Sequence, residues 1–419
     1  MLRFAQSPTH DMNIGDLRIA ILNYLVSQQR HESFTICIDD TDKETMIEGK
    51  DTEIMQILEK FALVHDTVFH QSEHLHMHQT FAIKLLEVGK VFVCTCNEEQ
   101  EHCSGHCENV DRSEYARRKE SGEPFVLRIK KPTEAIVYHD LIKGEVSTSP
   151  DEVGAFVILR QDASPTHDFA SACDDMLSGV TYLIQEDKNQ LHTAKQKHIK
   201  TALGYAEETT YAHLPTLLND DDTFSIKWLF EEGFLPDAII NYLLLPSIPI
   251  LNNADAPQKI FTLPEAIAWF KVENISNDAV TFDIEKLRFI NREHLKNMDD
   301  KVLSTLFGFA DADIGKLAKL YLEEASTLKE LKAKIEPIFA PKDFQSTYSD
   351  QMRTMETLIQ NAPMFHSYSD FEADLLQKSG LTGKNFFIAL RLLLTGAEHG
   401  PELSDIYPHI KPYILEIAS

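Results

Sequence analysis

The order of apolar and polar positions at the start of the chain predicts a strand, a turn and a helix. Residues 2–6 are mainly apolar, a polar stretch with Gly15 follows, and apolar residues then recur at helical spacing from Leu17 to Leu25. The N-terminus of such a helix offers unpaired N–H groups, and Gly15 lets a ligand approach the backbone. The segment therefore predicts either a phosphate-binding crossover or the ordinary first turn of an α/β domain.

A second apolar run, residues 34–38, predicts a buried strand that ends in an acidic turn containing Asp39, Asp40 and Asp42. Strands that alternate with helices indicate a parallel sheet with right-handed crossovers. Ligands bind beyond the carboxyl ends of the strands in such sheets, so we expect these acids beside the first turn. They could equally cap the helix that follows.

The remaining pattern divides the chain into regions. Residues 111–119 predict a short charged helix, residues 155–162 a return to the sheet, and the segment from Ser164 to Met176 the opening of another helix. Residues 225–300 are predicted to be mostly helical. The apolar periodicity after residue 301 predicts an all-helical region.

Composition excludes several classes of protein. The 419 residues are 43% hydrophobic and 25% charged, which is typical of a globular protein with several domains. No apolar run approaches the roughly 18 residues of a membrane span and no secretory signal is visible, so we expect a cytoplasmic protein without membrane contact. With 40 basic and 66 acidic side chains the net charge is −26, which leaves only local basic patches for a nucleic acid.

Four cysteines within fourteen residues predict a structural zinc site. Their spacing allows two short turns to place four thiolates around a tetrahedral ion, and His102 or His106 could replace one sulfur. A disulfide is the alternative, although thiols stay reduced in the cytoplasm. The predicted ligands are Cys94, Cys96, Cys103 and Cys107, whereas Cys37 and Cys173 are predicted core residues.

Residues 124–132 predict a strand with a concentration of positive charge. Its basic side chains are Arg128, Lys130 and Lys131. Phosphate contact is one use for such a face, and a solvated strand edge is the ordinary alternative.

Several motifs together resemble one family. They are R-F-A-x-S-P-T-x-D-M-x-I-G-x-L-R at residues 3–18, I-D-D-T-D-K-E at 38–44, Y-A-H-L-P at 211–215, E-E-G-F-L-P-D-A-I at 231–239 and L-L-L-T-G-A-E-H-G-P-E-L at 392–403. In these motifs, and over its whole length, the chain resembles bacterial glutamyl-tRNA synthetases of class I. The resemblance implies an α/β Rossmann-like catalytic domain with a zinc-binding insertion, followed by an all-α C-terminal region.

The resemblance also implies a role for each region of the chain. Residues 1–90 and 154–224 would form the catalytic domain, 91–153 the insertion that holds the tRNA acceptor end, 225–300 a stem-contact region and 301–419 a domain like those that bind anticodons. An active protein of this family would use ATP, Mg²⁺, L-glutamate and tRNA, in addition to the structural Zn²⁺. We expect a monomer.

Site residues follow from the matched motifs. Those implied to contact glutamate are Arg3, Ala5, Ser7, Asp39, His167, Ser171 and Gln185. Those implied to contact ATP are His10, Asn13, Gly15 and Asp187, of which Asn13 and Gly15 belong to the catalytic motif called HIGH.

The chain departs from the family pattern at the positions that do chemistry. Asn13 replaces the leading histidine of HIGH and cannot carry its positive charge. The mobile loop with two basic residues, called KMSKS, is replaced by the acidic stretch 220–224, and Lys227 is a poor substitute by position. Asp39, His167 and Gln185 replace a glutamate, a tyrosine and a carboxylate-binding arginine.

These departures leave three hypotheses. The chain is a paralogue that keeps the fold and RNA binding but activates glutamate poorly or not at all. Alternatively it is a working ligase in which His10, Asn13 and Lys188 replace the lost loop. In the third hypothesis, the crossover serves another nucleotide or an already charged tRNA.

Overall fold

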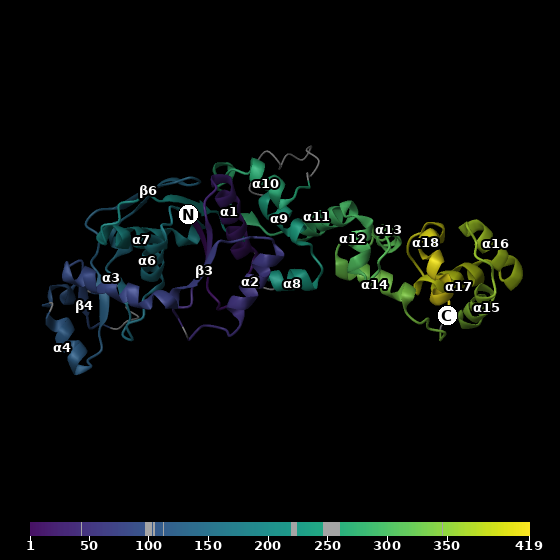
Figure 1. Ribbon diagram of the computed structural model, residues 1–419, viewed down its shortest axis with the longest axis horizontal. Coiled ribbons are helices and arrows are strands. Elements are labelled where there is room, and N and C mark those ends of the chain that lie inside the picture. The colour runs from purple at the N-terminus through teal and green to yellow at the C-terminus, as the bar shows by residue number, and fades with distance from the viewer. Residues whose placement is uncertain are drawn as a thin grey trace. The chain divides into compact units, whose positions relative to one another are not determined.

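The computed structural model describes residues 1–42, 44–96, 103, 105–111, 113–218, 224–245, 260–345 and 347–419. The chain divides into two compact units, residues 1–227 with 243–282 and residues 228–242 with 283–419. The first unit combines strands with helices, and the described part of the second is helical (Figure 1). None of the described helices has the length and apolar character needed to cross a membrane.

A seven-stranded sheet forms the centre of the first unit. Its order is β3-β2-β1-β9-β10-β6-β7, and neighbouring strands pair in parallel except in the β6–β7 hairpin, which confirms the predicted sheet type. The strands are β1 (Leu2–Gln6), β2 (Phe34–Ile38), β3 (Thr67–His70), β6 (Ile136–Asp140), β7 (Gly144–Thr148), β9 (Tyr182–Glu186) and β10 (Thr210–Leu214).

The strand order reverses between β1 and β9. From β1 the chain moves to β2 and β3 on one side, whereas β9 and β10 extend the sheet on the other. Such a reversal opens a crevice at the carboxyl ends of the two central strands, where α/β proteins bind ligands. The residues that follow β1, β2 and β9, including Ser7, Asp39 and Asp187, are therefore brought to the same edge.

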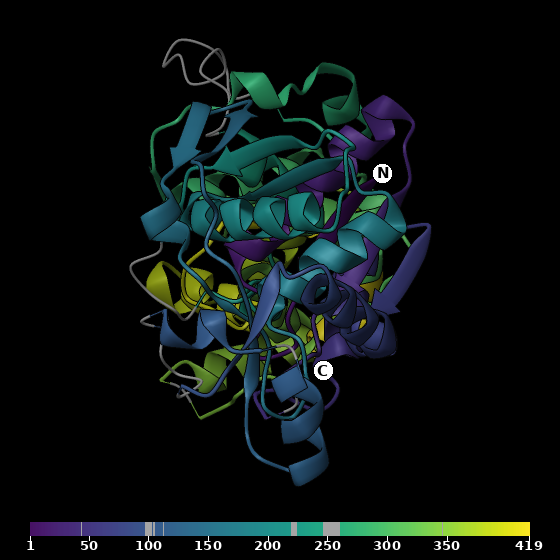
Figure 2. The ribbon, with the colours of Figure 1, turned by 90° about the vertical axis from the view of Figure 1, so that its left-hand side faces the viewer.

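Helix α1 (Ile14–Arg30) fills the predicted place after the first turn. Leu17, Ile21 and Leu25 are fully buried because the helical period turns them toward β1, β2 and β9. The unit also contains α2 (Lys50–Lys60), η1 (Gln71–His74), α3 (Leu75–Glu87), η2 (His106–Asn109), α4 (Ser113–Ser121), α5 (Pro150–Val153), α6 (His167–Ser178), η3 (Asp187–Asn189), α7 (Gln190–Ala202), α10 (Leu263–Trp269) and η5 (Val272–Asn274). Helices α6 and α7 lie side by side (Figures 1 and 2).

A second, three-stranded antiparallel sheet corrects one prediction. It consists of β4 (Val91–Cys94), β5 (Val126–Ile129) and β8 (Val157–Leu159). Residues 155–162 were predicted to return to the main sheet, and this is wrong, because β8 pairs with β5. The hairpin β6–β7 extends the main sheet instead. The alternation of apolar residues along a sequence predicts that a segment is a strand, but it does not predict which strand it pairs with. A short pair joins β11 (Leu217–Leu218) to β12 (Val280–Thr281).

The second unit is a helical domain with its own core, which confirms the predicted helical C-terminal region. Leu303, Leu317, Leu390 and Leu393 are fully buried in that core. Its helices are α11 (Ile284–Asn297), α12 (Asp300–Leu306), α13 (Asp313–Leu320), α14 (Leu328–Phe339), α15 (Ser349–Gln360), α16 (Tyr368–Ser379), α17 (Lys384–Thr395), α18 (Leu403–Ile410), η6 (Lys411–Tyr413) and α19 (Ile414–Ile417). The helices α8 (Ile226–Glu231) and α9 (Pro236–Leu244) precede them.

Candidate functional site

The N-terminus of α1 lies at the crevice and is capped by its own side chains. Asn13 Oδ1 accepts hydrogen bonds from the backbone N–H groups of Gly15 and Asp16, at 2.8 and 3.0 Å. Asp16 Oδ2 accepts in turn from the N–H of Asn13, at 3.1 Å, which completes a capping box. Three N–H groups that could hold a phosphate are thus already satisfied within the helix.

Glu186, at the end of β9, lies over Gly15. A Cβ atom on residue 15 would be 2.8 Å from Glu186 Oε1 and 3.1 Å from Asn13 Oδ1, so any larger residue would displace one of them. The close approach predicted for Gly15 is therefore made by a carboxylate of the chain itself. Glu186 also forms an ion pair with Lys188, at 2.5 Å.

The cations near this turn are engaged with acids. Lys50 is paired with Asp11 and, at 2.8 Å, with Glu53, and hydrogen bonding to Lys50 holds the pKa of Asp11 below its ordinary value. His10 Nε2 lies 3.4 Å from Asp16 Oδ2, and this interaction raises the pKa of His10. Lys50 and His10 thus neutralise carboxylates of the chain itself, whereas Arg18 of α1 donates a hydrogen bond to the carbonyl of Pro215.

The stretch predicted to replace KMSKS lies mostly outside the described residues, which resume at Phe224. Ser225 forms an isolated bridge with Asn13, and the N–H of Ile226 donates to the carbonyl of Met12 at 2.9 Å. The start of α8 is therefore tied to the α1 turn. The positive charge of Lys227 adds to the effect of Lys50 in lowering the pKa of Asp11.

The implied glutamate pocket is built around Arg3. The buried guanidinium is paired with Asp175, whose other oxygen accepts from Lys200 at 3.0 Å. Ser171 is buried on the same helix as Asp175, and its hydroxyl has no hydrogen-bond partner among the described residues. The implied pocket thus holds two buried cations, Arg3 and Lys200, that Asp175 neutralises, and one unsatisfied hydroxyl.

A second group of implied substrate residues is joined by hydrogen bonds. Ser7 Oγ donates to the carbonyl of Asp39 at 3.2 Å, and His167 Nδ1 lies 2.6 Å from Asp39 Oδ2. Burial alone would lower the pKa of His167 and raise the pKa of Asp39. The hydrogen bond and the attraction of charges between them act against burial, so the pKa of His167 is raised and the pKa of Asp39 is lowered. The alternative that Asp39, Asp40 and Asp42 cap the following helix is wrong, because the N-cap residue of α2 is Gly49.

The structure places the remaining implied residues separately. Ala5 pairs with Cys37 in the β1–β2 ladder, and half-buried Gln185 pairs with His213 in the β9–β10 ladder. Asp187 forms an ion pair with Lys143 at 2.7 Å.

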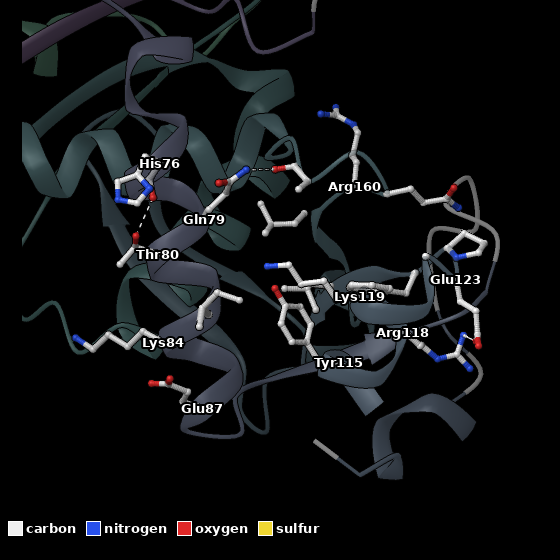
Figure 3. Close-up of a pocket in the computed structure, with 18 residues that line it drawn as sticks. His76, Gln79, Thr80, Lys84, Glu87, Tyr115, Arg118, Lys119, Glu123 and Arg160 are labelled. Atoms are coloured by element: carbon white, nitrogen blue, oxygen red, sulfur yellow. Dashed lines mark hydrogen bonds and ion pairs between the residues drawn. The ribbon is translucent and has the colours of Figure 1, made fainter. Parts of the chain in front are cut away.

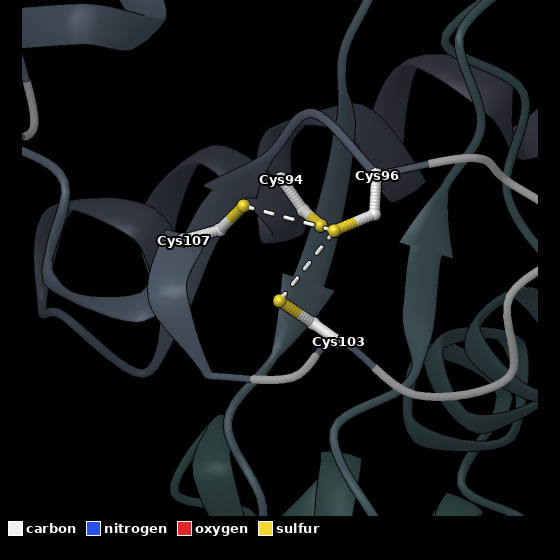
Figure 4. Close-up of side chains that lie close together, drawn as sticks. All are labelled: Cys94, Cys96, Cys103 and Cys107. Atoms are coloured by element: carbon white, nitrogen blue, oxygen red, sulfur yellow. Dashed lines mark hydrogen bonds between the residues drawn. The ribbon is translucent and has the colours of Figure 1, made fainter.

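The four predicted cysteine ligands converge between β4 and η2 (Figure 4). Cys96 Sγ lies 3.8 Å from Cys103 Sγ and 3.9 Å from Cys107 Sγ, close to the roughly 3.8 Å between sulfurs that each lie about 2.3 Å from a tetrahedral Zn²⁺. All four thiols are free, so the disulfide alternative is wrong. His106 Nε2 lies 3.8 Å from Cys96 Sγ, and His102 is outside the described residues.

Without a cation, the surroundings of Cys96 oppose the ionisation of its thiol. Burial, followed by hydrogen bonds with the neighbouring cysteines, raises the pKa of Cys96 to about 12. A divalent ion would remove this opposition by binding the thiolates directly. Four protein ligands leave no open position, so the donor set fits a structural zinc ion.

The basic face predicted on residues 124–132 is only partly correct. Arg128 is fully buried beneath the small sheet, so its placement on an exposed face is wrong. All four residues of β5 are buried, because this strand lies in the middle of the small sheet between β4 and β8. Lys131 is paired with Asp151 and Lys130 lies 3.8 Å from Glu108.

A cavity of about 860 Å³ beside α3 and α4 was missed by the sequence analysis. Lys119 and Tyr115 face into it (Figure 3), with the Lys119 ammonium 5.7 Å from the centre of the Tyr115 ring. Its other charged lining residues are Lys84, Glu87, Arg118, Glu123 and Arg160. The amphipathic pattern of α4 was the available signal, but its partner surface on α3 lies some thirty residues earlier in the chain.

The reversal of strand order between β1 and β9, with the capped turn beside it, defines a doubly wound α/β domain, a class in which ligands bind at this edge of the sheet. A family model described as "tRNA synthetases class I (E and Q), catalytic domain" matches residues 1–289. The chain is 58% identical to glutamate–tRNA ligase 2 of a Sulfurovum species and 49% identical to glutamate–tRNA ligase 1 of a Nitratiruptor species, with all of each chain covered. It therefore belongs to the class I glutamyl-tRNA synthetase family.

Solved structures share the fold. A glutamate tRNA ligase from Elizabethkingia meningosepticum, crystallised with its amino acid, superposes with a TM-score of 0.79. The match covers 99% of this chain and 97% of that chain at 21% identity. Glutamate-tRNA synthetase from Elizabethkingia anophelis gives a TM-score of 0.77 at 22% identity, with 99% of this chain and 98% of that chain covered.

Proposed function

We propose that this chain retains the tRNA-binding role of its family but activates glutamate with ATP poorly or not at all. One observation carries the proposal, the closed capping box of Asn13 and Asp16 with Glu186 over Gly15. Phosphates would have to displace hydrogen bonds that are already made, and would meet carboxylates where the reaction needs cations.

The chemistry explains why charge is decisive. Glutamate activation is attack of a carboxylate on the α-phosphate of ATP, in which protein cations and Mg²⁺ stabilise the charge of the transition state. The nearby cations Lys50, His10 and Lys188 are paired with acids. Each would have to leave its partner before it could bind ATP.

The amino-acid pocket supports the same proposal. Gln185 can donate a hydrogen bond but cannot form the bidentate, charged pair that arginine makes with a carboxylate. Arg3 and Asp39 have formed pairs with Asp175 and His167. Glutamate would therefore bind with fewer charged contacts than the family pattern provides.

The division of the chain into functional regions is part of the proposal. Residues 1–90 and 154–224 would form the catalytic scaffold, and 91–153 an insertion held together by Zn²⁺ on the four cysteines. Residues 225–300 would contact the tRNA stem and 301–419 its anticodon. The cavity that the insertion forms with α3 contains Lys119 and Tyr115, and it offers cations and an aromatic ring, the groups that hold phosphates and stacked bases.

A working glutamate–tRNA ligase is the second candidate. The 58% identity with the Sulfurovum ligase over the whole chain favours it, since most of that protein's residues are kept. That alignment nevertheless runs over 434 positions against 419 residues here, so this chain carries deletions relative to the ligase.

Glutamate-dependent exchange of pyrophosphate into ATP distinguishes the two candidates. With total tRNA and Mg²⁺ present, we expect exchange at the background rate, because three cations near the α1 turn, His10, Lys50 and Lys188, are paired with acids. The Sulfurovum ligase, assayed in parallel, provides the positive control. Exchange at a comparable rate would refute the proposal and establish the second candidate.

Binding of RNA is expected to survive and to depend on salt. In filter binding with total tRNA, Lys119→Ala should weaken binding and reduce the slope of log affinity against log salt by about one, which is the loss of one phosphate contact. Glu87→Gln removes an anion from the same cavity and should have the opposite effect. Binding that does not change with salt, or with either substitution, would contradict the RNA role of this cavity.

A further inference from the structure

Two histidines and an aspartate converge where η1 and α3 meet α6, and none of the three belongs to the implied substrate residues or to the cysteine cluster. His74 Nδ1 lies 2.9 Å and His78 Nε2 2.8 Å from the same oxygen of Asp174. The histidines come from η1 and α3, and Asp174 comes from α6, about a hundred residues later. His78 and Asp174 are fully buried, whereas the side chain of His74 is 31% exposed.

The arrangement has the geometry of a metal site. Residues four apart share a helix face, so both imidazoles point the same way. The three ligand atoms lie within 4.8 Å of one another. Ligands about 2.0 to 2.1 Å from a tetrahedral ion are about 3.3 Å apart, so an ion needs the group to open by only a few tenths of an ångström. Stacking of His74 on Phe69, with ring centres 5.0 Å apart, fixes its ring.

Two buried polar atoms beside the cluster lack partners among the described residues. Gln71 donates from Nε2 to the second oxygen of Asp174 at 3.0 Å, but its Oε1 is unpaired. Nδ1 of His78 is unpaired as well. Unpaired buried atoms are costly, and a water bound to a metal ion here would pair with Gln71 Oε1, whereas His78 Nδ1 stays unpaired with or without an ion.

An acidic cavity gives a cation access to the cluster. It has a volume of about 660 Å³, and both Gln71 and His78 line it. The remaining charged residues on its wall are Asp40, Asp42, Glu44, Asp162 and Arg160. Four carboxylates against one guanidinium produce a negative potential that favours entry of a cation.

We propose that His74, His78 and Asp174 bind one divalent ion of borderline softness, with Zn²⁺ as its first candidate. The ion takes lone pairs from His74 Nδ1 and His78 Nε2 and one carboxylate oxygen, and each imidazole then carries its proton on its other nitrogen. These three ligands leave a fourth position of a tetrahedral ion for water. The ion ties α3 to α6, the helix that also carries Ser171 and Asp175.

Metal content of the purified full chain tests this site without reference to activity. After dialysis against micromolar free Zn²⁺ we expect two zinc ions per chain, one on the cysteines and one here. His74→Gln and Asp174→Asn should each leave one ion, and should weaken the second binding event at least about tenfold in competition with a chromogenic chelator. His76→Gln is the matched control, because His76 lies on α3 between the two proposed histidine ligands in sequence, and this variant should keep two ions.

The cysteine site is separated from the new site by substitution and by spectrum. Cys103→Ser should remove the other ion and leave this one. With Co²⁺, the thiolate site gives an intense near-ultraviolet charge-transfer band, whereas the proposed site adds only visible absorption. His74 is partly exposed, so circular dichroism of His74→Gln should match the wild type; if the variant does not fold, the wild-type Co²⁺ titration decides. One ion per chain and a single, thiolate-type Co²⁺ spectrum would overturn the proposal.

Discussion

Replacing Asp175 by asparagine is expected to lower the free energy of unfolding of the first unit by about 3 to 5 kcal/mol. Asp175 is fully buried between the almost fully buried cations of Arg3 and Lys200. The substitution leaves two buried positive charges without an anion, and this costs more than the pair itself contributes. It is therefore a larger effect than the loss of an ordinary hydrogen bond.

The chain's two tryptophans allow this unit to be followed separately. Trp269 lies in α10, which packs on α1 in the first unit, and Trp228 belongs to the second unit. In a Trp228→Phe background, urea unfolding followed by fluorescence reports the first unit alone. Asp151→Asn removes the exposed partner of Lys131 and should leave the midpoint unchanged. A loss below about 1 kcal/mol for Asp175→Asn would contradict the prediction.

The stability that Asp175 contributes through Arg3 and Lys200 depends on pH. Burial opposes ionisation, but the attraction of Arg3 and Lys200 holds the pKa of Asp175 below its ordinary value. For a carboxyl whose pKa is lowered by folding, the stabilisation is complete above the unfolded value, about 3.9, and is lost as the pH falls through the folded value. The difference in free energy of unfolding between the wild type and Asp175→Asn should therefore be constant near neutrality and become smaller only below about pH 4.

Local patterns in the sequence predicted the parts of the fold and site that depend on neighbours along the chain. The strand, turn and helix of residues 2–30 and the cysteine cluster are examples, since each lies within about thirty residues. Partners distant in sequence were not predictable in this way. The pairing of β8 with β5 and the burial of Arg128 both depend on which strands meet.

The contacts within the candidate site were likewise not predictable from the sequence. The motifs indicated that Asn13, Asp39 and Gln185 had changed, but not what the changed residues contact. The capping box of Asn13 and the pair of His167 with Asp39 became evident only in three dimensions. The spacing of His74 and His78 was visible in the sequence, but Asp174, which makes them a cluster, was not near them in the chain.

Gln185→Arg is expected to strengthen binding of L-glutamate by about tenfold to a hundredfold. A charge-assisted, bidentate hydrogen bond to a carboxylate contributes about 1.5 to 3 kcal/mol, and each 1.4 kcal/mol is a factor of ten in the dissociation constant. Gln185 is half-buried at the carboxyl end of β9, where the sheet places ligand contacts. Its backbone position in the β9–β10 ladder does not need to change.

Isothermal titration calorimetry with glutamate measures the change, and Gln185→Lys is the matched control. Lysine adds the same charge but lacks the planar fork that holds both carboxylate oxygens, so its gain should be clearly smaller. Equal gains would mean that charge alone was missing, and no gain from arginine would mean that Gln185 does not face the substrate. In the expected case the pocket has kept its shape, and the weak activation proposed for this chain follows from the charges that its side chains have lost.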